Sequence, residues 1–225
     1  VMVKRTRTTG PGADDVEVDV EVPPGLHIRP AGDDIVVGDV VFPAGEELRS
    51  GHAGVLASIG AVDVAVHPRL RVGVFSTGDE LIPAGQPLGA GQIHDSNRIT
   101  LLSLVRGAGY DAVDLGLIPD DDARITAAIV DGVRRCDALI TSGGVSMGDF
   151  DLVKVVLDRI GDMRWMQVAI RPAKPLAFGT VSGGSVVDGS LVDVPVFGLP
   201  GNPVSSVVSF ELFARPALRR MAGVA

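Results

Sequence analysis

From residue 70 onward, short apolar runs alternate with segments of helical periodicity, and no other feature of the sequence restricts the possible folds as strongly. The runs at 72–75 and 138–140 contain only apolar residues and glycine, as expected of parallel strands that are covered on both faces. Parallel strands need long crossover connections, which are right-handed and usually helical. The alternation therefore predicts an α/β domain built on a doubly wound, mostly parallel sheet.

The same periodicity predicts the individual elements of this domain. Strands are expected at 71–75, 112–115, 138–141, 164–170, 176–180 and 194–197. Helices are expected at 97–106, 121–134, 152–160 and 203–221. In doubly wound sheets, ligands bind in the loops that follow the carboxyl ends of the strands. Those loops are therefore the first places to look for a site.

Residues 1–68 have a different, β-rich character. Valine alternates with acidic residues over 16–22, which is the period of a half-exposed strand, and shorter strands are expected at 1–3, 36–42 and 62–66. A short helix is expected to begin with Ser50 as its N-cap and to end at Gly60. We predict a partial β-rich module over 1–68 and the α/β domain over 69–225. Because the chain begins inside an expected strand, we expect it to be a fragment of a longer protein.

Charge and composition exclude several classes of function. The formal net charge of −8 argues against a surface for nucleic acid or for an anionic membrane. No apolar run of about 18 residues and no signal peptide occur, so a soluble, cytoplasmic protein is expected. Cys136 is the only cysteine, which excludes an intrachain disulfide and a Cys-x-x-Cys site.

Two expected strand-end loops carry carboxylates. Residues 76–80 bring Asp79 and Glu80 directly after a strand, and residues 94–97 bring Asp95 before a helix. Such oxygen ligands suit Mg²⁺, which binds through one or two carboxylates and substrate phosphates. The alternative is that Asp95 or Ser96 simply caps the helix and that Asp79 and Glu80 form a turn. Such caps are common.

The loop at 141–151 is rich in glycine and serine. Its backbone N–H groups could approach a phosphate closely at a helix N-terminus, whereas Asp149 and Asp151 point to a metal ion or a pterin-like N–H donor. A glycine-rich turn with an aspartate N-cap is the alternative. The loop also fits the G-x-S-x-G pattern around Ser146, but no histidine follows Ser146, which excludes the triad order of an α/β-hydrolase.

Two further segments suit an oxyanion. Residues 198–205 place Asn202 as an N-cap and Pro203 at the first helical position, so that the helix N-terminus is rigidly aimed. Arg171 and Lys174 lie three residues apart in an expected turn and could clamp an anion. For the segment with Arg171 and Lys174, a solvated turn without a ligand remains the alternative.

Together these segments resemble the MoeA-type molybdopterin molybdenumtransferases, the molybdenum insertases that include the gephyrin E domain. The matching motifs occur in the family's order at 77–81, 91–97, 120–121, 142–151, 171–175 and 198–205. Weaker similarity at 28–34 and 56–60 extends the resemblance over nearly the whole chain. One such motif is weak evidence, whereas six in order are strong.

The resemblance implies a MogA-like molybdopterin-binding α/β domain and a transferase that inserts molybdate into adenylylated molybdopterin with Mg²⁺, releasing AMP. It implies catalytic roles for Glu80, Asp95, Asp120 and Asp151, of which Glu80, Asp95 and Asp151 would hold the metal. Arg171, Lys174 and Ser205 would bind molybdate or phosphate. The remaining substrate-binding residues are expected to be Thr77, Gly78, Asp79, Ser96, Asn97, Ser142, Gly143, Gly144, Ser146, Gly148, Asp149, Pro200, Gly201, Asn202 and Pro203.

The sequence departs from the family pattern in places. Arg171-Pro172-Ala173-Lys174-Pro175 stands where Lys-Pro-Gly-Lys-Pro is usual, and His94 stands where tyrosine is common. An upstream segment and a C-terminal β-domain of the family are missing, and family members complete the cleft across a homodimer. Two other functions stay open: a non-catalytic pterin-nucleotide binding or scaffold module, and a MogA-type adenylyltransferase, which residues 1–68 and 198–205 disfavour.

Overall fold

The computed structural model describes residues 5–144, 151–187 and 190–224 and divides into two compact units, Val1–Glu46 and Glu47–Ala225. The first unit contains one antiparallel pair, β1 (Thr6–Thr9) with β2 (Asp15–Val18). None of its described residues is buried, because its valines alternate with charged residues and have no second layer to pack against. The strand expected over 16–22 therefore ends at Val18, and 36–42 forms turns instead of a strand.

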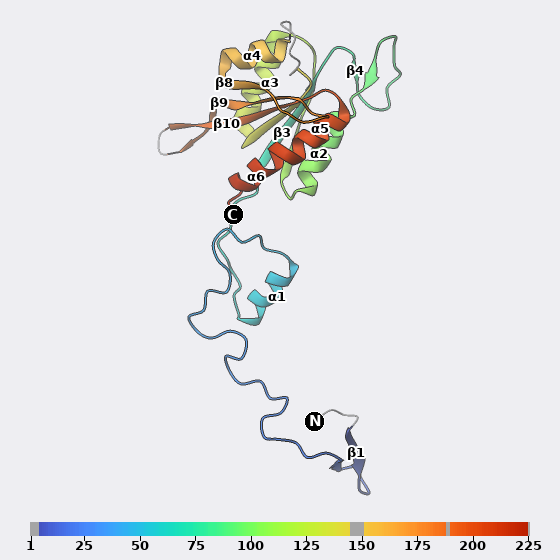
Figure 1. Ribbon diagram of the computed structural model, residues 1–225, viewed down its shortest axis with the longest axis vertical. Helices are drawn as coiled ribbons and strands as arrows, with labels where there is room; N and C mark the ends of the chain where they lie inside the picture. Colours follow the sequence, from blue (N-terminus) through green and yellow to red (C-terminus); the bar gives the residue numbers. More distant parts are fainter. Residues whose placement is uncertain (1–4, 145–150, 188–189, 225) are drawn as a thin grey trace. The chain divides into compact units, whose positions relative to one another are not determined.

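The second unit is built on a six-stranded sheet (Figure 1), in the order β6-β3-β7-β10-β9-β8. The strands are β3 (Arg71–Thr77), β6 (Asp111–Ile118), β7 (Ala138–Ser142), β8 (Gly161–Gln167), β9 (Pro175–Val187) and β10 (Ser190–Leu199). β6, β3, β7 and β10 run parallel, whereas β9 is antiparallel to both of its neighbours. This confirms the predicted α/β fold with a mostly parallel sheet.

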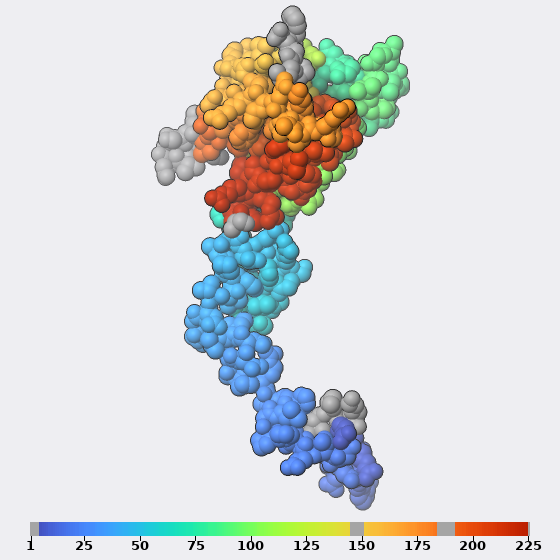
Figure 2. All heavy atoms as spheres, in the orientation of Figure 1, coloured from blue at the N-terminus to red at the C-terminus, as the bar shows by residue number. Residues whose placement is uncertain are grey.

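Helices cover both faces of the sheet. On one face, α2 (Asn97–Gly107), α5 (Pro203–Ser209) and α6 (Arg215–Met221) pack in a core that contains Val72, Ile140 and Phe210. On the other, α3 (Asp122–Arg135) and α4 (Leu152–Ile160) pack in a core that contains Phe75 and Leu139. Neighbouring residues of β7 thus point into different cores, as the period of a strand requires. In Figure 2 the red atoms of 203–221 lie against the orange atoms of the β8–β9 region.

Several expected elements are corrected by the structure. The helix expected at 203–221 is interrupted by a π-helical turn, η2 (Phe210–Ala214). The short helix is α1 (Ser50–Ser58), and its N-cap is Arg49, not Ser50; the Arg49 amide donates to His52 Nδ1 at 3.1 Å. No strand forms at 62–66. β4 (Leu81–Ile82) and β5 (Ile93–His94) form a short pair of strands that was not expected. β4 follows the loop at 76–80, and β5 leads into the loop at 94–97.

The domain boundary expected near residue 68 stays a prediction. The two compact units of the structure separate after Glu46. Among the residues that the structure describes, no helix combines the length and the apolar character needed to cross a membrane.

Gly179 is a point of close backbone approach between β8 and β9. A Cβ atom there would lie 2.6 Å from Met163 Sδ and 2.7 Å from Met163 Cα. We expect Gly179→Ala to destabilise the fold by about 2–3 kcal/mol, because the added methyl group forces two paired strands apart. Urea-induced unfolding measures this. In the control Gly107→Ala, the methyl group meets nothing within 4 Å and helix propensity rises, so stability should be unchanged or higher. Equal stability of the two variants would contradict the prediction.

Candidate functional site

The carboxyl ends of β3, β7 and β10 meet at one edge of the sheet around a small pocket of about 100 Å³. Its wall combines apolar surface with serine and threonine hydroxyls, backbone groups and acidic side chains, and none of the described residues that line it is a lysine or an arginine. The lining residues are Ser76, Thr77, Glu80, Leu81, Ile93, His94, Asp95, Ser96, Asn97, Ser142, Gly143, Gly201 and Pro203. All four strand-end loops singled out in the sequence contribute to this lining. The loop at 94–97 does so with every residue, and the loops at 76–80, 141–151 and 198–205 do so with two or three residues each.

The loop after β3 approaches the loop after β6. The amide of Asp120 donates to Asp79 Oδ1 at 3.1 Å. Partial burial raises the pKa of Asp120, and the negative charges of Asp79, Glu80 and Asp151 raise it further. The four carboxylates therefore repel one another at this edge. Among the residues that the structure describes, no group of three or more histidine, cysteine or acidic side chains is arranged to hold a metal ion.

Asp95 is buried and fully engaged with protein groups. Its carboxylate accepts hydrogen bonds from Ser76 Oγ at 3.1 Å, from the Arg98 amide at 3.2 Å and from Arg98 Nε at 2.7 Å. The expected role of Asp95 as a metal ligand does not fit this arrangement, because Arg98 already balances its charge. Asp95 thus holds the start of α2, whereas Ser96, which directly precedes the helix, makes no side-chain capping bond.

Arg98 joins Asp95 to the neighbouring strand. Arg98 Nη1 donates to Asp114 on β6 at 2.6 Å, and its side chain is 12% exposed. Burial by itself lowers the pKa of Arg98, but the hydrogen bonds to Asp95 and Asp114 outweigh this and raise it. Arg98 and Asp114 were missed in the sequence. The three-residue spacing of Asp95 and Arg98 at a helix start is the one local signal that could have indicated the pair.

The glycine-rich loop and the loop after β10 are linked by Asn97. Its side-chain amide donates to Ser142 Oγ at 2.8 Å and to the Gly201 carbonyl at 2.7 Å. The Gly143 amide also donates to the Leu199 carbonyl at 3.2 Å. Gly143 has a φ of 90°, a conformation that favours glycine. Asn97, Ser142 and Gly201, which were expected to bind substrate, are thus brought together.

Other expected residues have structural tasks or lie elsewhere. Asp151 caps α4, with Oδ1 accepting from the Val153 amide at 3.2 Å. Asn202 caps α5 as predicted, accepting from the Ser205 amide at 3.2 Å, and Pro203 begins that helix. The following expected site residues do not line the pocket: Gly78, Asp79, Asp120, Gly144, Asp151, Arg171, Lys174, Pro200, Asn202 and Ser205. Ser146, Gly148 and Asp149 lie outside the described residues.

Arg171 and Lys174 lie in the connection between β8 and β9, and both are exposed. β8 runs parallel to β10 because each is antiparallel to β9, so this connection lies at the same sheet edge as the pocket, two strands beyond β10. Ala173 between them is buried and has a φ of 76°. Glycine adopts this conformation without strain, which accounts for glycine at the same position in the family pattern.

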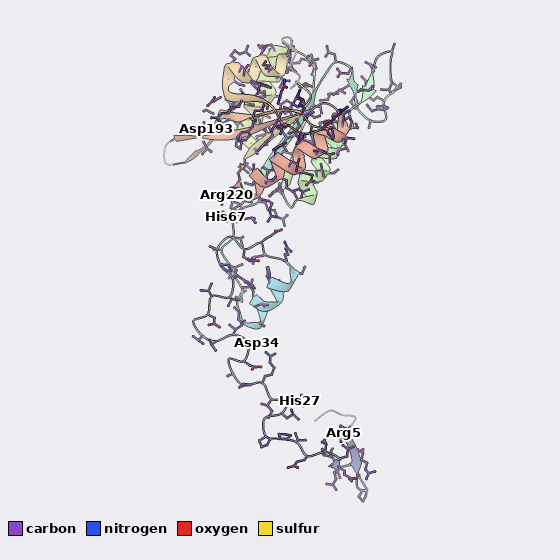
Figure 3. All side chains as sticks on the ribbon, in the orientation of Figure 1. Arg5, His27, Asp34, His67, Asp193 and Arg220 are labelled. Carbon is purple, nitrogen blue, oxygen red and sulfur yellow. The ribbon has the colours of Figure 1, made fainter. Side chains whose placement is uncertain are left out.

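Three side chains of the second unit that Figure 3 labels, His67, Asp193 and Arg220, lie away from this edge. Arg220 and His67 lie near the end of α6, at the other end of the helical segment that begins beside the pocket, and Asp193 lies on the β9–β10 hairpin. Among the histidines that the structure describes, His94 lines the pocket.

Known proteins match the chain over nearly its whole length. A family described as "Probable molybdopterin binding domain" matches residues 73–220, and "MoeA N-terminal region (domain I and II)" matches residues 1–60. A molybdopterin molybdenumtransferase of Haemophilus influenzae is 40% identical over 200 residues, covering 89% of this chain and 47% of that protein. A gephyrin of Dictyostelium discoideum is 35% identical over 241 residues, covering 99% of this chain and 33% of that protein.

Solved structures agree with these sequence matches. A crystal structure of a molybdopterin biosynthesis MoeA protein from Pyrococcus horikosii has a TM-score of 0.73 at 30% identity, covering 99% of this chain and 52% of that chain. A molybdenum cofactor biosynthesis protein B, with a TM-score of 0.51 at 15% identity, shares the fold. The chain spans about half the length of the molybdenumtransferases that it matches. The sequence matches at both ends of the chain and the fold agree, and the chain belongs to the family described as a probable molybdopterin binding domain, here preceded by a MoeA-type N-terminal region.

Proposed function

We propose that this chain carries the substrate-binding α/β domain of a cytoplasmic molybdenum insertase, which inserts molybdate into adenylylated molybdopterin and releases AMP. The observation that carries the proposal is that Asn97 joins three strand-end loops around one pocket. Ligands of doubly wound folds bind at this edge of the sheet. Family membership supplies the identity of the ligand.

The pocket itself suits only part of such a ligand. Drug-sized ligands need pockets of about 300–1,000 Å³, whereas this pocket holds about 100 Å³. Its wall offers Glu80, serine hydroxyls and the backbone of Gly143, and no cation. We therefore place a polar end that donates hydrogen bonds, such as the pterin, in the pocket, while the charged groups of the ligand extend along the sheet edge.

Arg171 and Lys174 are proposed to hold molybdate or phosphate at that edge. Both side chains are exposed, and neither forms an ion pair with another described residue. Two cations three residues apart can grip an oxyanion, the arginine in bidentate fashion and the lysine as a point charge. Ser205 is a weaker candidate, because its hydroxyl contacts Asn202 Oδ1 at 3.4 Å and is largely buried.

We further propose that one or two of the carboxylates of Glu80, Asp120 and Asp151 would hold Mg²⁺, and not Asp95, whose charge Arg98 already balances. Burial, followed by the negative charges of Asp79, Glu80 and Asp151, raises the pKa of Asp120, and a divalent cation would relieve the repulsion between these charges. Mg²⁺ usually takes one or two carboxylates and keeps substrate phosphates and water as its other ligands, so a complete protein cage is not needed. When bound, the ion supplies charge neutralisation at the phosphoanhydride; the carboxylates orient it, and the loops exclude water from the pocket.

A homodimer is part of the proposal. Residues 5–46 bury none of their side chains within their own unit, and apolar side chains such as Val16, Ile28 and Val37 are exposed there. A marginal unit of this kind gains stability when a second chain covers it. Family members complete their cleft in a dimer, which is consistent with this surface.

Two other functions make different predictions. A scaffold or non-catalytic binding module would bind the pterin nucleotide without releasing AMP, and this remains the alternative for the chain as it stands. An adenylyltransferase of the MogA type shares the α/β fold, but the match of residues 1–60 to the MoeA N-terminal region favours the insertase.

Calorimetric titration of adenylylated molybdopterin into the chain, with and without Mg²⁺, tests the proposal, followed by an assay of AMP release on addition of molybdate. Binding that Mg²⁺ strengthens, with AMP release, supports an insertase site. Binding without release favours the non-catalytic alternative. No binding by folded protein rejects the proposed function.

Two possible roles of Asp151, as the cap of α4 and as a ligand of Mg²⁺, can be tested separately. We expect Asp151→Ala to lower helix stability by about 1 kcal/mol through loss of the α4 cap, and Asp151→Asn to retain the cap. If the carboxylate also serves Mg²⁺, both variants should lose roughly tenfold of the Mg²⁺-dependent affinity for adenylylated molybdopterin. Unfolding curves and titrations of both variants decide this. Normal Mg²⁺-dependent affinity in Asp151→Asn would reduce Asp151 to a helix cap.

A further inference from the structure

The side chain of Asn97 connects two loops that are far apart in the sequence. One hydrogen-bond acceptor is Ser142 Oγ at the end of β7, at 2.8 Å, and the other is the Gly201 carbonyl after β10, at 2.7 Å. A primary amide has two N–H donors. Both donors of Asn97 are therefore used within the protein, so its amide nitrogen has no hydrogen left for a ligand.

Asn97 is itself held firmly from the other side. It is the first residue of α2, and the residues around it anchor that end of the helix: Asp95 accepts from Ser76 of β3, and Arg98 pairs with Asp95 and Asp114. Asp114 also accepts from the Gly116 amide at 2.9 Å. The start of α2 is thereby tied to β3 and β6.

Asp114 and Gly116 flank an irregularity of the sheet. Val74 pairs with Asp114, but Phe75 pairs with Gly116, so Leu115 is an extra residue in β6. Such a bulge bends its strand and redirects the residues that follow. After the bulge, β6 continues to Ile118, and the chain then reaches Asp120. The side chains of Asn97 and Arg98, the latter with Asp95, thus connect the carboxyl ends of β3, β7 and β10 with the middle of β6.

The geometry points to Asn97 as a positioning residue that holds the loops after β7 and β10 at the spacing at which one ligand contacts both. This inference rests on the proposed function for the identity of the ligand. It changes the expected role of Asn97, which acts through Ser142 and Gly201 instead of donating to the substrate. Because the loops meet at a pocket of about 100 Å³, small changes of their spacing alter the pocket strongly.

Two variants test the inference: Asn97→Ala removes the amide, and Asn97→Asp keeps its shape but removes both donors. The first readout is hydrogen exchange of the Gly143 amide, which donates to the Leu199 carbonyl, without any ligand. We expect this exchange to accelerate roughly tenfold, while exchange at Val74 and Ile140 in the sheet stays unchanged. The second readout is calorimetric affinity for adenylylated molybdopterin, which should fall roughly tenfold, with a nearly unchanged midpoint of urea unfolding.

The control is Ser103→Ala, which removes an exposed hydroxyl that bonds Ile99 on the same helix and should leave both readouts unchanged. Weaker binding with unchanged exchange would mean that Asn97 contacts the ligand directly, and unchanged exchange and binding would mean that it positions nothing. Either result overturns the inference. If the wild-type chain does not bind adenylylated molybdopterin, the proposed function fails, and faster exchange at Gly143 still supports loop positioning by Asn97.

Discussion

Replacing Arg98 with alanine is expected to destabilise the α/β unit by about 3–5 kcal/mol, the usual cost of removing one partner from a buried ion pair. The Asp95 side chain is 1% exposed, so its carboxylate would remain buried without the positive charge that now balances it. Asp114 is partly exposed and would be solvated instead. Urea-induced unfolding of the wild type and the variant measures the difference.

Two further variants isolate the buried charge as the cause. In the double variant Arg98→Ala with Asp95→Asn, the buried group is neutral, and most of the lost stability should return. Arg106→Ala removes an exposed arginine of the same helix and should change the free energy of unfolding by less than about 0.5 kcal/mol. A loss below about 1 kcal/mol in Arg98→Ala, or no recovery in the double variant, would show that Arg98 does not balance a buried charge.

Replacing Asp120 with asparagine is expected to stabilise the fold at neutral pH and to weaken Mg²⁺-dependent ligand binding roughly 10- to 100-fold. Burial and the neighbouring carboxylates raise the pKa of Asp120 in the folded protein. A carboxyl group with a raised pKa favours the folded state below its unfolded pKa, and this contribution is lost as the pH rises through the folded pKa. At pH 7 the ionised Asp120 therefore opposes folding, and the neutral asparagine does not.

The stability difference should be largest near neutral pH and should shrink as the pH falls through the raised pKa of Asp120 towards the unfolded pKa of an aspartate, because Asp120 then becomes protonated in the wild type. Thermal unfolding from pH 4 to 8, with calorimetry of adenylylated molybdopterin with and without Mg²⁺, checks both parts. Asp121→Asn is a matched control, because asparagine also caps α3 at the position where Asp121 accepts from the Arg124 amide. A loss of stability at pH 7 in Asp120→Asn, or an unchanged effect of Mg²⁺, would contradict the prediction.

The periodicity of apolar residues predicted the helices and strands of the α/β unit well where the apolar residues are also buried. The helix expected at 152–160 has those bounds in the structure, and the buried strands at 71–75 and 138–141 are each correct at their start and extended by one or two residues. Prediction failed over 36–42 and 62–66, where valines are frequent but none of the described strands pairs with these residues. A strand is stable only when another strand satisfies its backbone hydrogen bonds.

The candidate site was predicted by the position of its loops and less well by the role of each residue. Asn202 was expected to cap a helix, and it does. Asp95 was expected to bind metal, but its oxygens are used by Ser76 and Arg98. The sequence shows which side chains carry oxygen or charge at a strand end. It does not show which of those groups already have a partner inside the protein.

The sequence by itself determined the fold class and the family, because both depend on short-range periodicity and on motifs of adjacent residues. Only the tertiary structure decided the strand order and the partners of Asn97, which are 45 and 104 residues away along the chain. Those contacts depend on which strands lie next to one another and in what register, and residues far apart in sequence meet only after the sheet has assembled.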